Sequence, residues 1–300
     1  MKTSHILYIA LFMLITGACS DTSNENASSS AIQNPDVKGH LIIVGGGPRP
    51  ESIMSKIVEL SNDGHILIIP MASSIPDTVG WEQRDQFNGY GATSVDILMM
   101  DEDDKFDLDV AEKIRAAGGI WFSGGDQNRL MEFLGDGILI DALFEAYRNG
   151  AVISGTSAGA AVMSRVMITG DERNPDRNRS FATIHQDNII TTGGIGLVDN
   201  MIIDQHFIRR SRLNRLISAL LDHPESMAAG IDEATALWVK PGGNYEVLGD
   251  SQIILLEEGK TGRPAEAGLQ SAADIRMHVL PPTSTFSVRN GKVVQVKLPE

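Results

Sequence analysis

The sequence predicts a doubly wound α/β fold, in which a mostly parallel sheet carries helices on both faces. Short continuous apolar runs recur along the chain, as is typical of strands buried on both faces of a parallel sheet. Stretches with helical periodicity separate these runs, as in βαβ units. Glycine clusters follow three of the runs, and strand ends of this kind are where ligands bind in open α/β sheets.

The elements follow in order along the chain. We expect strands at residues 41–44, 65–70, 95–98, 119–122 and 151–154. We expect helices at residues 51–60, 109–117 and 128–147, the last one broken around Gly135. Short alternating strands then follow at 237–239, 245–247, 253–256, 277–280 and 292–296, and we expect them as antiparallel additions at one edge or end of the same domain.

Composition and charge limit the possible functions. Of the 300 residues, 42% are hydrophobic and 21% are charged, which is ordinary for a globular protein. No internal repeat or second linker is visible, so we expect one α/β domain over residues 37–300. The net charge of −14 argues against a nucleic-acid partner, because phosphate binding requires a basic surface.

The N-terminus has the pattern of an export signal. Lys2 precedes an apolar stretch at residues 6–15, which is too short to span a bilayer and fits a signal peptide. The residues before Cys19 resemble a bacterial lipoprotein signal, although Thr16 replaces the usual leucine. Plain secretion with cleavage near Ala18 is the alternative.

The lipoprotein reading makes residues 1–19 a signal peptide whose Cys19 is lipidated, and it predicts an extracytoplasmic, lipid-anchored location in the bacterial envelope. Cys19 is the only cysteine, which excludes an intramolecular disulfide. Residues 20–36 are polar and rich in serine and asparagine, so we expect a disordered tether between the membrane and the domain.

Residues 152–161 are the strongest functional signal. A buried strand runs into a Gly-x-Ser-x-Gly turn and then into a helix of small residues, which exposes the Ser157 hydroxyl on a strained corner. A Cβ at Gly155 or Gly159 would collide with the tightly folded backbone. Free N–H groups at the helix start suit an oxyanion. A plain glycine-rich turn is the alternative.

A nucleophilic serine needs a base and an acid that orients it. Of the seven histidines, His206 stands out because it ends an apolar strand, again at the C-terminal edge of the sheet. Asp232 and Glu233 lie next to another strand, while Asp171 and Glu172 form a rival pair. Spacing does not decide between the two pairs.

The first glycine cluster does not have the pattern of a dinucleotide site. Residues 45–47 are three consecutive glycines followed by Pro-Arg-Pro, which lacks the Gly-x-Gly-x-x-Gly spacing of a dinucleotide site. We therefore expect no dinucleotide there.

Four segments together resemble a known family. Gly-Thr-Ser-Ala-Gly-Ala at 155–160, Phe-Ser-Gly-Gly-Asp-Gln at 122–127, Ile-Asp-Gln-His-Phe at 203–207 and Gly-Ile-Asp-Glu-Ala-Thr-Ala at 230–236 are similar to segments of the cyanophycinases, serine exopeptidases related to dipeptidase E. The resemblance runs from about residue 38 to the end of the chain. It implies a sandwich similar to class I glutamine amidotransferases, a homodimer, and no metal or organic cofactor.

The resemblance also implies roles for single residues. Ser157 is the nucleophile and His206 the general base, with Glu233 as the orienting acid and Glu172 still open as its rival. The further expected groups are oxyanion N–H donors at Gly124, Gly125 and Ala158, a substrate-pocket residue at Gln127, and carboxylate clamps at Arg210, Arg212 and Arg215.

The arginines bear on the substrate. Guanidinium groups suit bidentate carboxylate binding, although a solvated basic helix face is the ordinary explanation of such a run. The resemblance implies cyanophycin, a poly-aspartate whose side chains carry arginine, cleaved to β-Asp-Arg dipeptides. An aspartyl dipeptidase and a surface lipoprotein that binds acidic peptides without cutting them are the alternatives. The sequence does not identify the acid that holds the substrate arginine.

Overall fold

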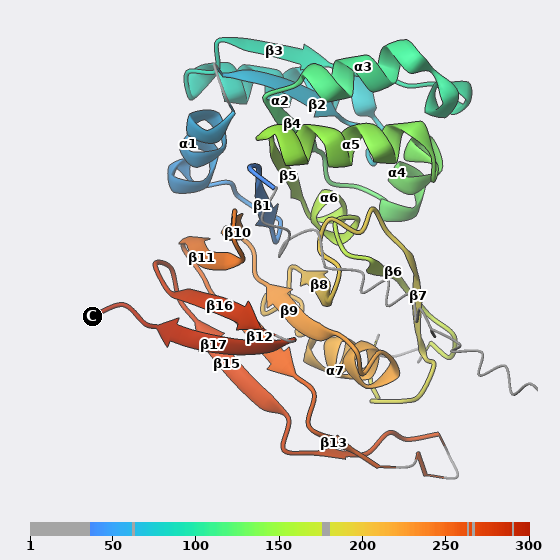
Figure 1. The fold of residues 1–300 in the computed structure, drawn as a ribbon. Coiled ribbons are helices and arrows are strands. Elements are labelled where there is room, and N and C mark those ends of the chain that lie inside the picture. Colours follow the sequence, from blue (N-terminus) through green and yellow to red (C-terminus); the bar gives the residue numbers. More distant parts are fainter. Residues whose placement is uncertain (1–36, 62–63, 176–180, 263, 266–267, 290) are drawn as a thin grey trace, which may run out of the picture.

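The computed structural model describes residues 37–61, 64–175, 181–262, 264–265, 268–289 and 291–300 (Figure 1). The expected signal peptide, Cys19 and tether lie outside the described residues. Within the described ranges, no helix is both long and apolar enough to cross a membrane.

Five parallel strands form one side of a nine-stranded sheet. In spatial order they are β1 (His40–Val44), β5 (Val152–Thr156), β4 (Gly119–Phe122), β2 (His65–Ile69) and β3 (Ser94–Ile97). These are the five predicted strands, and the four inner ones are almost completely buried. Because β3 lies at the edge, it has no fully buried residue.

The C-terminal strands divide between two sheets. Beyond β1 the large sheet continues in antiparallel fashion with β10 (Thr235–Lys240), β11 (Asn244–Gly249), β16 (Thr285–Arg289) and β17 (Lys292–Lys297). A second sheet has the order β15 (Arg276–Leu280), β12 (Ile253–Glu257), β9 (Met227–Ile231) and β8 (Met201–Gln205). Two short ladders pair β6 (Val166–Glu172) with β7 (Ile189–Gly193), and β13 (Lys260–Thr261) with β14 (Ala272–Ala273).

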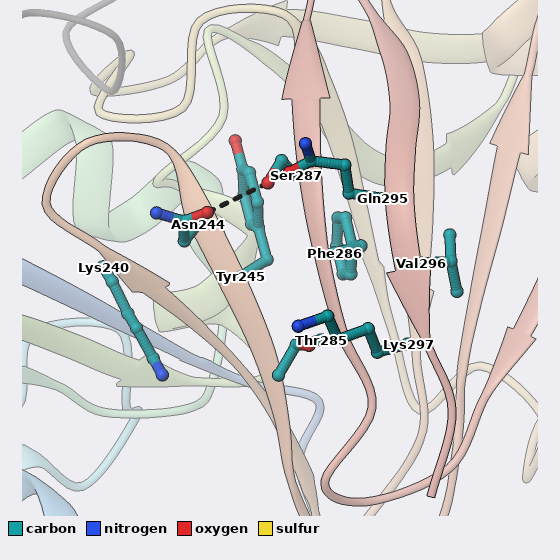
Figure 2. A pocket seen from close by; sticks show the side chains of 9 residues that line it. All are labelled: Lys240, Asn244, Tyr245, Thr285, Phe286, Ser287, Gln295, Val296 and Lys297. Atoms are coloured by element: carbon teal, nitrogen blue, oxygen red, sulfur yellow. Dashed lines mark hydrogen bonds between the residues drawn. The ribbon is translucent and has the colours of Figure 1, made fainter.

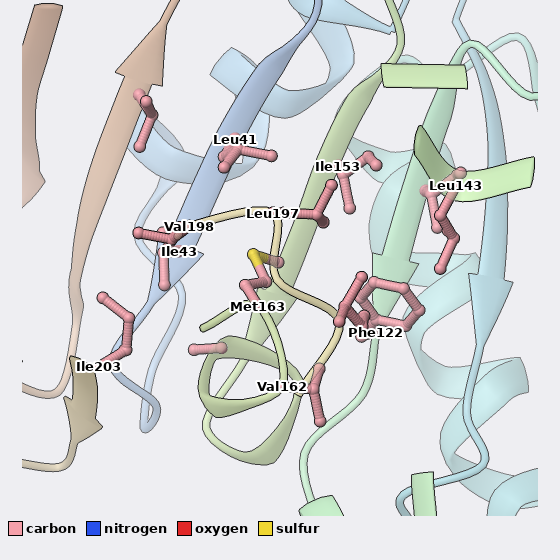
Figure 3. Close-up of a cluster of buried hydrophobic side chains, with 14 of the residues drawn as sticks. Leu41, Ile43, Phe122, Leu143, Ile153, Val162, Met163, Leu197, Val198 and Ile203 are labelled. Atoms are coloured by element: carbon pink, nitrogen blue, oxygen red, sulfur yellow. The ribbon is translucent and has the colours of Figure 1, made fainter. Parts of the chain in front are cut away.

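One strand lies in a different sheet from the one expected. The strand before His206 is β8, which pairs in parallel with β9 in the second sheet and not with the large sheet. Its inner face nevertheless packs on the large sheet, since Ile203 joins the same core cluster as Ile43 and Ile153 (Figure 3). His206 therefore comes to the C-terminal edge of the large sheet through packing between the two sheets.

Helices cover both faces of the large sheet, as predicted. They are α1 (Glu51–Leu60), α2 (Pro76–Gly89), α3 (Leu108–Ala116), α4 (Gln127–Leu134), α5 (Ile138–Asn149), α6 (Ala158–Ala161) and α7 (Leu213–Asp222), with a 3₁₀ helix, η2, at Glu102–Phe106. The predicted break at Gly135 is present, because this residue ends α4 with a φ of 65°. Helix α2 was not predicted from the sequence.

Alternation along the strands creates two apolar cores. In β1, Ile43 faces the core that includes α3, α4 and α5, whereas Ile42 faces the core that includes α1 and Phe87 of α2. This is the period-two pattern of a sheet covered on both sides. Truncating a residue such as Ile153 to alanine would cost about 2–5 kcal/mol in the free energy of unfolding.

Candidate active site

Ser157 lies on the corner between β5 and α6. Its φ of 54° and ψ of −109° are unusual for a residue with a side chain, and such a conformation costs about 1–3 kcal/mol. The flanking glycines make the corner possible. A Cβ on Gly155 would lie 2.5 Å from the carbonyl oxygen of Gly159, and one on Gly159 would lie 2.4 Å from that of Phe122. The prediction that a Cβ at either glycine would collide with the backbone is thus confirmed. Helix α6, which follows the corner, is only four residues long.

Three side chains from separate segments form a continuous hydrogen-bonded row. Ser157 Oγ lies 2.9 Å from His206 Nε2, and His206 Nδ1 lies 2.7 Å from Glu233 Oε1. Because a carboxylate only accepts, the geometry assigns the proton to Nδ1, and Nε2 is left to accept from the serine hydroxyl. We call these three residues the Ser–His–Glu row.

The end of β1 holds the backbone of this row. Three consecutive carbonyl oxygens, at positions 44 to 46, accept from the N–H groups of Ser157 at 3.0 Å, His206 at 2.7 Å and Ala234 at 2.9 Å, in that order. All three donors have a positive φ, between 49° and 54°. The hydrogen bonds to this short stretch of backbone therefore help to offset the conformational strain in all three segments.

The three glycines at the end of β1 leave space for the row. A Cβ on Gly46 would lie 2.4 Å from His206 Cε1, and one on Gly47 would lie 2.8 Å from Glu233 Cβ. The sequence predicted only that no dinucleotide binds here. The role of the cluster was missed, because the residues it accommodates are about 160 and 190 positions away in the chain.

The rival acids lie elsewhere. Glu172 accepts from Phe181 N at 2.7 Å and from Asn188 Nδ2 at 3.1 Å, within the region of the β6–β7 ladder. Asp232 accepts from Arg209 N at 2.9 Å. Of the four candidate acids, Glu233 is the one whose carboxylate contacts His206.

Burial controls the basicity of His206. Desolvation lowers the pKa of the imidazole from its ordinary value of 6.5, the hydrogen bond to Glu233 opposes this effect, and the charges of Arg210 and Arg212 add to it. The net pKa shift is downward. A lowered pKa favours the neutral imidazole, which is the form that a proton acceptor requires.

Three residues close to Ser157 have backbone N–H groups that are not used by the described part of the protein. Those of Gly124, Gly125 and Ala158 donate to no acceptor among the residues that the structure describes. Gly125 has a φ of 145°, and a Cβ there would lie 2.0 Å from the carbonyl oxygen of Ala72. Glycine is thus required at position 125, where the chain passes beside the corner.

A polar cleft of about 350 Å³ opens in front of Ser157. Its lining combines carboxylates, guanidinium groups, amides and one ring: Gly125, Asp126, Gln127, Asn128, Ser157, Thr169, Gly170, Asp171, Phe181, Gln205, Arg210, Arg212 and Arg215. Gln127 and all three predicted arginines are thus brought to the cleft.

The three arginines differ in how far the protein already binds them. Arg215 is buried and forms a two-point ion pair with Asp204, one contact of which, Nε to Oδ2, measures 2.9 Å. Arg212 donates through Nη1 to the backbone and side-chain oxygens of Gln205, and burial together with the charge of Arg215 lowers its pKa to about 10. Arg210 is exposed and has no carboxylate within 4.0 Å in the described part of the chain. As predicted carboxylate clamps, Arg212 and Arg215 therefore share their charge with protein partners.

A larger cavity of about 690 Å³ lies on the added strands (Figure 2). Its lining residues are Lys240, Asn244, Tyr245, Thr285, Phe286, Ser287, Gln295, Val296 and Lys297. No member of the Ser–His–Glu row lines it, and its Ser287 donates to Asn244 Oδ1 at 2.9 Å instead of to a base. Volume alone would select the wrong site, so we place the candidate active site in the smaller cleft.

The fold and the Ser–His–Glu row are typical of serine hydrolases, in which a histidine activates a serine on a strand–turn–helix corner. In the described ranges, no group of three or more His, Cys, Asp or Glu side chains is placed to hold a metal ion.

Comparisons with known proteins identify the family. Residues 40–246 match the model of peptidase family S51, so this chain belongs to that family. It is 30% identical over 278 residues to a cyanophycinase of Synechococcus elongatus, and the match covers 89% of this chain and 84% of the relative. A cyanophycinase of Geminocystis herdmanii is 33% identical over 226 residues, covering 73% of this chain and 80% of the relative.

A solved structure agrees in fold. The crystal structure of a peptidase from an acI-B1 actinobacterium has a TM-score of 0.62 and 25% identity, and the match covers 85% of this chain and 98% of that one. The resemblance found in the sequence is thus confirmed for family and fold.

Proposed function

We propose that this chain is a serine exopeptidase that hydrolyses cyanophycin and releases β-Asp-Arg dipeptides. The observation that carries the proposal is the row from Ser157 Oγ through His206 to Glu233, with contacts of 2.9 and 2.7 Å, beside a cleft lined by both acids and arginines. The similarity to proteins named cyanophycinases supports the substrate.

In the first half of the reaction, Ser157 Oγ attacks the carbonyl carbon of the scissile peptide while His206 Nε2 takes the hydroxyl proton. Glu233 accepts a hydrogen bond from Nδ1 and stabilises the imidazolium that forms. The N–H groups of Gly125 or Gly124 and of Ala158 are available for the oxyanion, since no described acceptor uses them. His206 then gives its proton to the leaving amine, and an acyl-enzyme remains.

In the second half, a water molecule takes the place of the leaving amine. His206 accepts one proton from the water as its oxygen attacks the ester carbonyl, and it returns that proton to Ser157 Oγ when the ester bond breaks. The released product has a new carboxylate. The strained Ser157 backbone holds Oγ toward both reactants throughout.

Ser157→Ala tests the enzymatic proposal. We expect at least about a thousandfold loss of β-Asp-Arg release from cyanophycin, with an unchanged fold by circular dichroism. A serine-directed fluorophosphonate should label the wild type and not the variant. Activity near the wild-type level in Ser157→Ala would reject the mechanism. A protein that binds cyanophycin without labelling or release would be the non-catalytic binding lipoprotein.

An aspartyl dipeptidase is the second candidate. The modest volume of the cleft, about 350 Å³, favours it, because a small site suits a short peptide. Hydrolysis of cyanophycin and of a panel of α- and β-aspartyl dipeptides by the same preparation would separate the two candidates. Faster turnover of the dipeptides, with no release from the polymer, would establish the dipeptidase.

We also propose that Cys19 is lipidated and holds the enzyme outside the cytoplasm, in the bacterial envelope. The N-terminal sequence supports this location. Cys19→Ala should shift the protein from the membrane fraction to the soluble fraction and abolish labelling by a fatty acid. The proposed homodimer would be seen by sedimentation, as a species of twice the chain mass.

A further inference from the structure

We propose that Asp171 binds the cationic side chain of the substrate and so selects arginine-bearing aspartyl peptides over plain aspartyl peptides. This inference rests on the proposed function and assigns a residue to one part of it. Asp171 lies on β6 and lines the same cleft as Ser157. It is exposed, so a ligand in the cleft can reach its carboxylate.

The carboxylate of Asp171 is available. No N–H group or cation among the described residues bonds to it, and its own backbone N–H donates to Thr169 Oγ1 at 3.3 Å. The other acid of the cleft, Asp126, is already engaged: its Oδ1 accepts the N–H groups of Asn128 and Arg129 and caps the start of α4. Among the described residues, Asp171 is therefore the acid of this cleft whose carboxylate accepts no hydrogen bond from the protein.

The backbone around Asp171 is held in place. The β6–β7 ladder loses its regular register between Ile168 and Glu172, and Gly170 has a φ of 104°. The Gln127 side chain donates through Nε2 to the carbonyl oxygens of Ile168, at 3.0 Å, and of Thr169. The backbone next to Asp171 therefore does not have to be ordered when the substrate arrives, which reduces the entropic cost of binding.

Gln127 adds a second acceptor next to Asp171. Because both bonds of its amide use Nε2, its Oε1 is the polar atom left without a donor in the described part of the chain. A Cβ on Gly170 would lie 3.4 Å from Gln127 Nε2, so the amide lies directly against the residue that precedes Asp171. A carboxylate and an amide oxygen together suit a planar group that only donates hydrogen bonds, such as guanidinium.

Three arginines of the cleft carry the opposite charge. Arg210, Arg212 and Arg215 come from the segment that follows β8, whereas Asp171 and Gln127 come from β6 and α4. The site thus offers cations from one segment and acceptors from two others. A substrate unit with a carboxylate and a guanidinium complements both sets, while a plain aspartyl peptide leaves Asp171 without a partner.

A pair of substrates of equal shape tests the role of Asp171. One is a β-aspartyl-arginine oligomer and the other carries citrulline, whose neutral ureido group has nearly the shape of guanidinium. A charge-assisted hydrogen bond predicts that wild-type kcat/KM favours arginine by about tenfold to hundredfold. Asp171→Asn should lower kcat/KM for arginine by that factor, leave citrulline unchanged, and bring the ratio close to one. Asp171→Glu should restore part of the preference.

Asp103→Asn is the matched control, because Asp103 is an exposed acid in η2 that does not line the cleft, and the substitution removes the same charge. Both substrates should react with it as with the wild type. If Asp171→Asn keeps the preference for arginine, or slows both substrates equally, the assignment of Asp171 is wrong while the proposed function stands. If the wild type cleaves neither substrate, the proposed function itself fails.

Discussion

The Ser–His–Glu row and the arginine segment at residues 209–215 meet at the same cleft, yet their hydrogen bonds differ. The row is complete within the protein and leaves one reactive atom, Ser157 Oγ, facing the cleft. In the arginine segment, Asp204 and Gln205 already bind Arg215 and Arg212. The reactive groups are therefore preformed, whereas a substrate carboxylate must share two of the three guanidinium groups with protein oxygens.

Glu233→Gln would damage the preformed row most. The amide cannot accept from Nδ1–H in the same way, so the imidazole loses its tautomer and its charge partner. We expect kcat to fall by about 10³–10⁴-fold with little change in KM. Steady-state kinetics on cyanophycin measures both constants.

Glu172→Gln is the control for that experiment, because Glu172 bonds within the region of the β6–β7 ladder and not to His206. We expect its kcat to remain close to that of the wild type. A greater loss in Glu172→Gln than in Glu233→Gln would reassign the orienting acid.

Asp204→Ala would remove the protein partner of Arg215 and so test the arginine segment. It leaves the buried Arg215 guanidinium without its counter-charge, which costs about 3–5 kcal/mol in the free energy of unfolding. Urea unfolding measures this change. The double variant Asp204→Leu, Arg215→Met should recover much of the stability, since an apolar pair can replace a buried ion pair. A loss below about 1 kcal/mol in the single variant would show that the pair is not buried in solution.

Gly46→Ala would test how closely the row is fitted. Its Cβ would lie 2.4 Å from His206 Cε1, so the imidazole must move away from Ser157. If the imidazole moves by about 1 Å, we expect kcat to fall by about 10²-fold. Gly89→Ala is the control, because a Cβ there meets nothing within 4 Å. Equal rates for the two variants would mean that His206 is free to adjust.

The smallest expected change is the shift in pH dependence that Arg210→Gln should cause, and it connects the two regions. The charge of Arg210 lowers the pKa of His206, so its removal raises that pKa. Activity requires the neutral imidazole, and the acid limb of the kcat/KM profile should therefore move to higher pH. The shift should shrink in high salt. Arg289→Gln, an exposed arginine on β16, should leave the limb in place.

The sequence predicted those parts of the molecule that depend on short stretches of chain. The apolar runs predicted the parallel strands, and the turn around Ser157 predicted the corner. Helix α2 was missed because only Gly80, Gln83 and Phe87 are buried along it, so its apolar periodicity is weak. The placement of β8 in a second sheet depends on strand pairing across the chain, which no local pattern reports.

In the site, too, the sequence predicted the residue types but not the contacts between distant parts of the chain. Residue types and motif order indicated Ser157, His206 and an acid at 232–233, but spacing could not choose the acid. The choice depends on side-chain direction: Glu233 points to His206, and its neighbour Asp232 accepts from Arg209 N instead. Likewise the sequence marked the arginines but not their internal partners, because the pairing of Arg215 with Asp204 requires α7 to pack beside the end of β8.

The three carbonyl groups at positions 44 to 46 have a consequence for changes in chain length. They accept hydrogen bonds from the N–H groups of Ser157, His206 and Ala234, in that order along the chain. The distance from one residue to the next in this stretch therefore sets how far apart the three segments lie. Inserting or deleting one residue there would displace its partners by about 3.3 Å, more than a hydrogen bond tolerates. Loop grafting or library design in this scaffold should therefore vary the cleft-lining segments and keep the length of this stretch fixed.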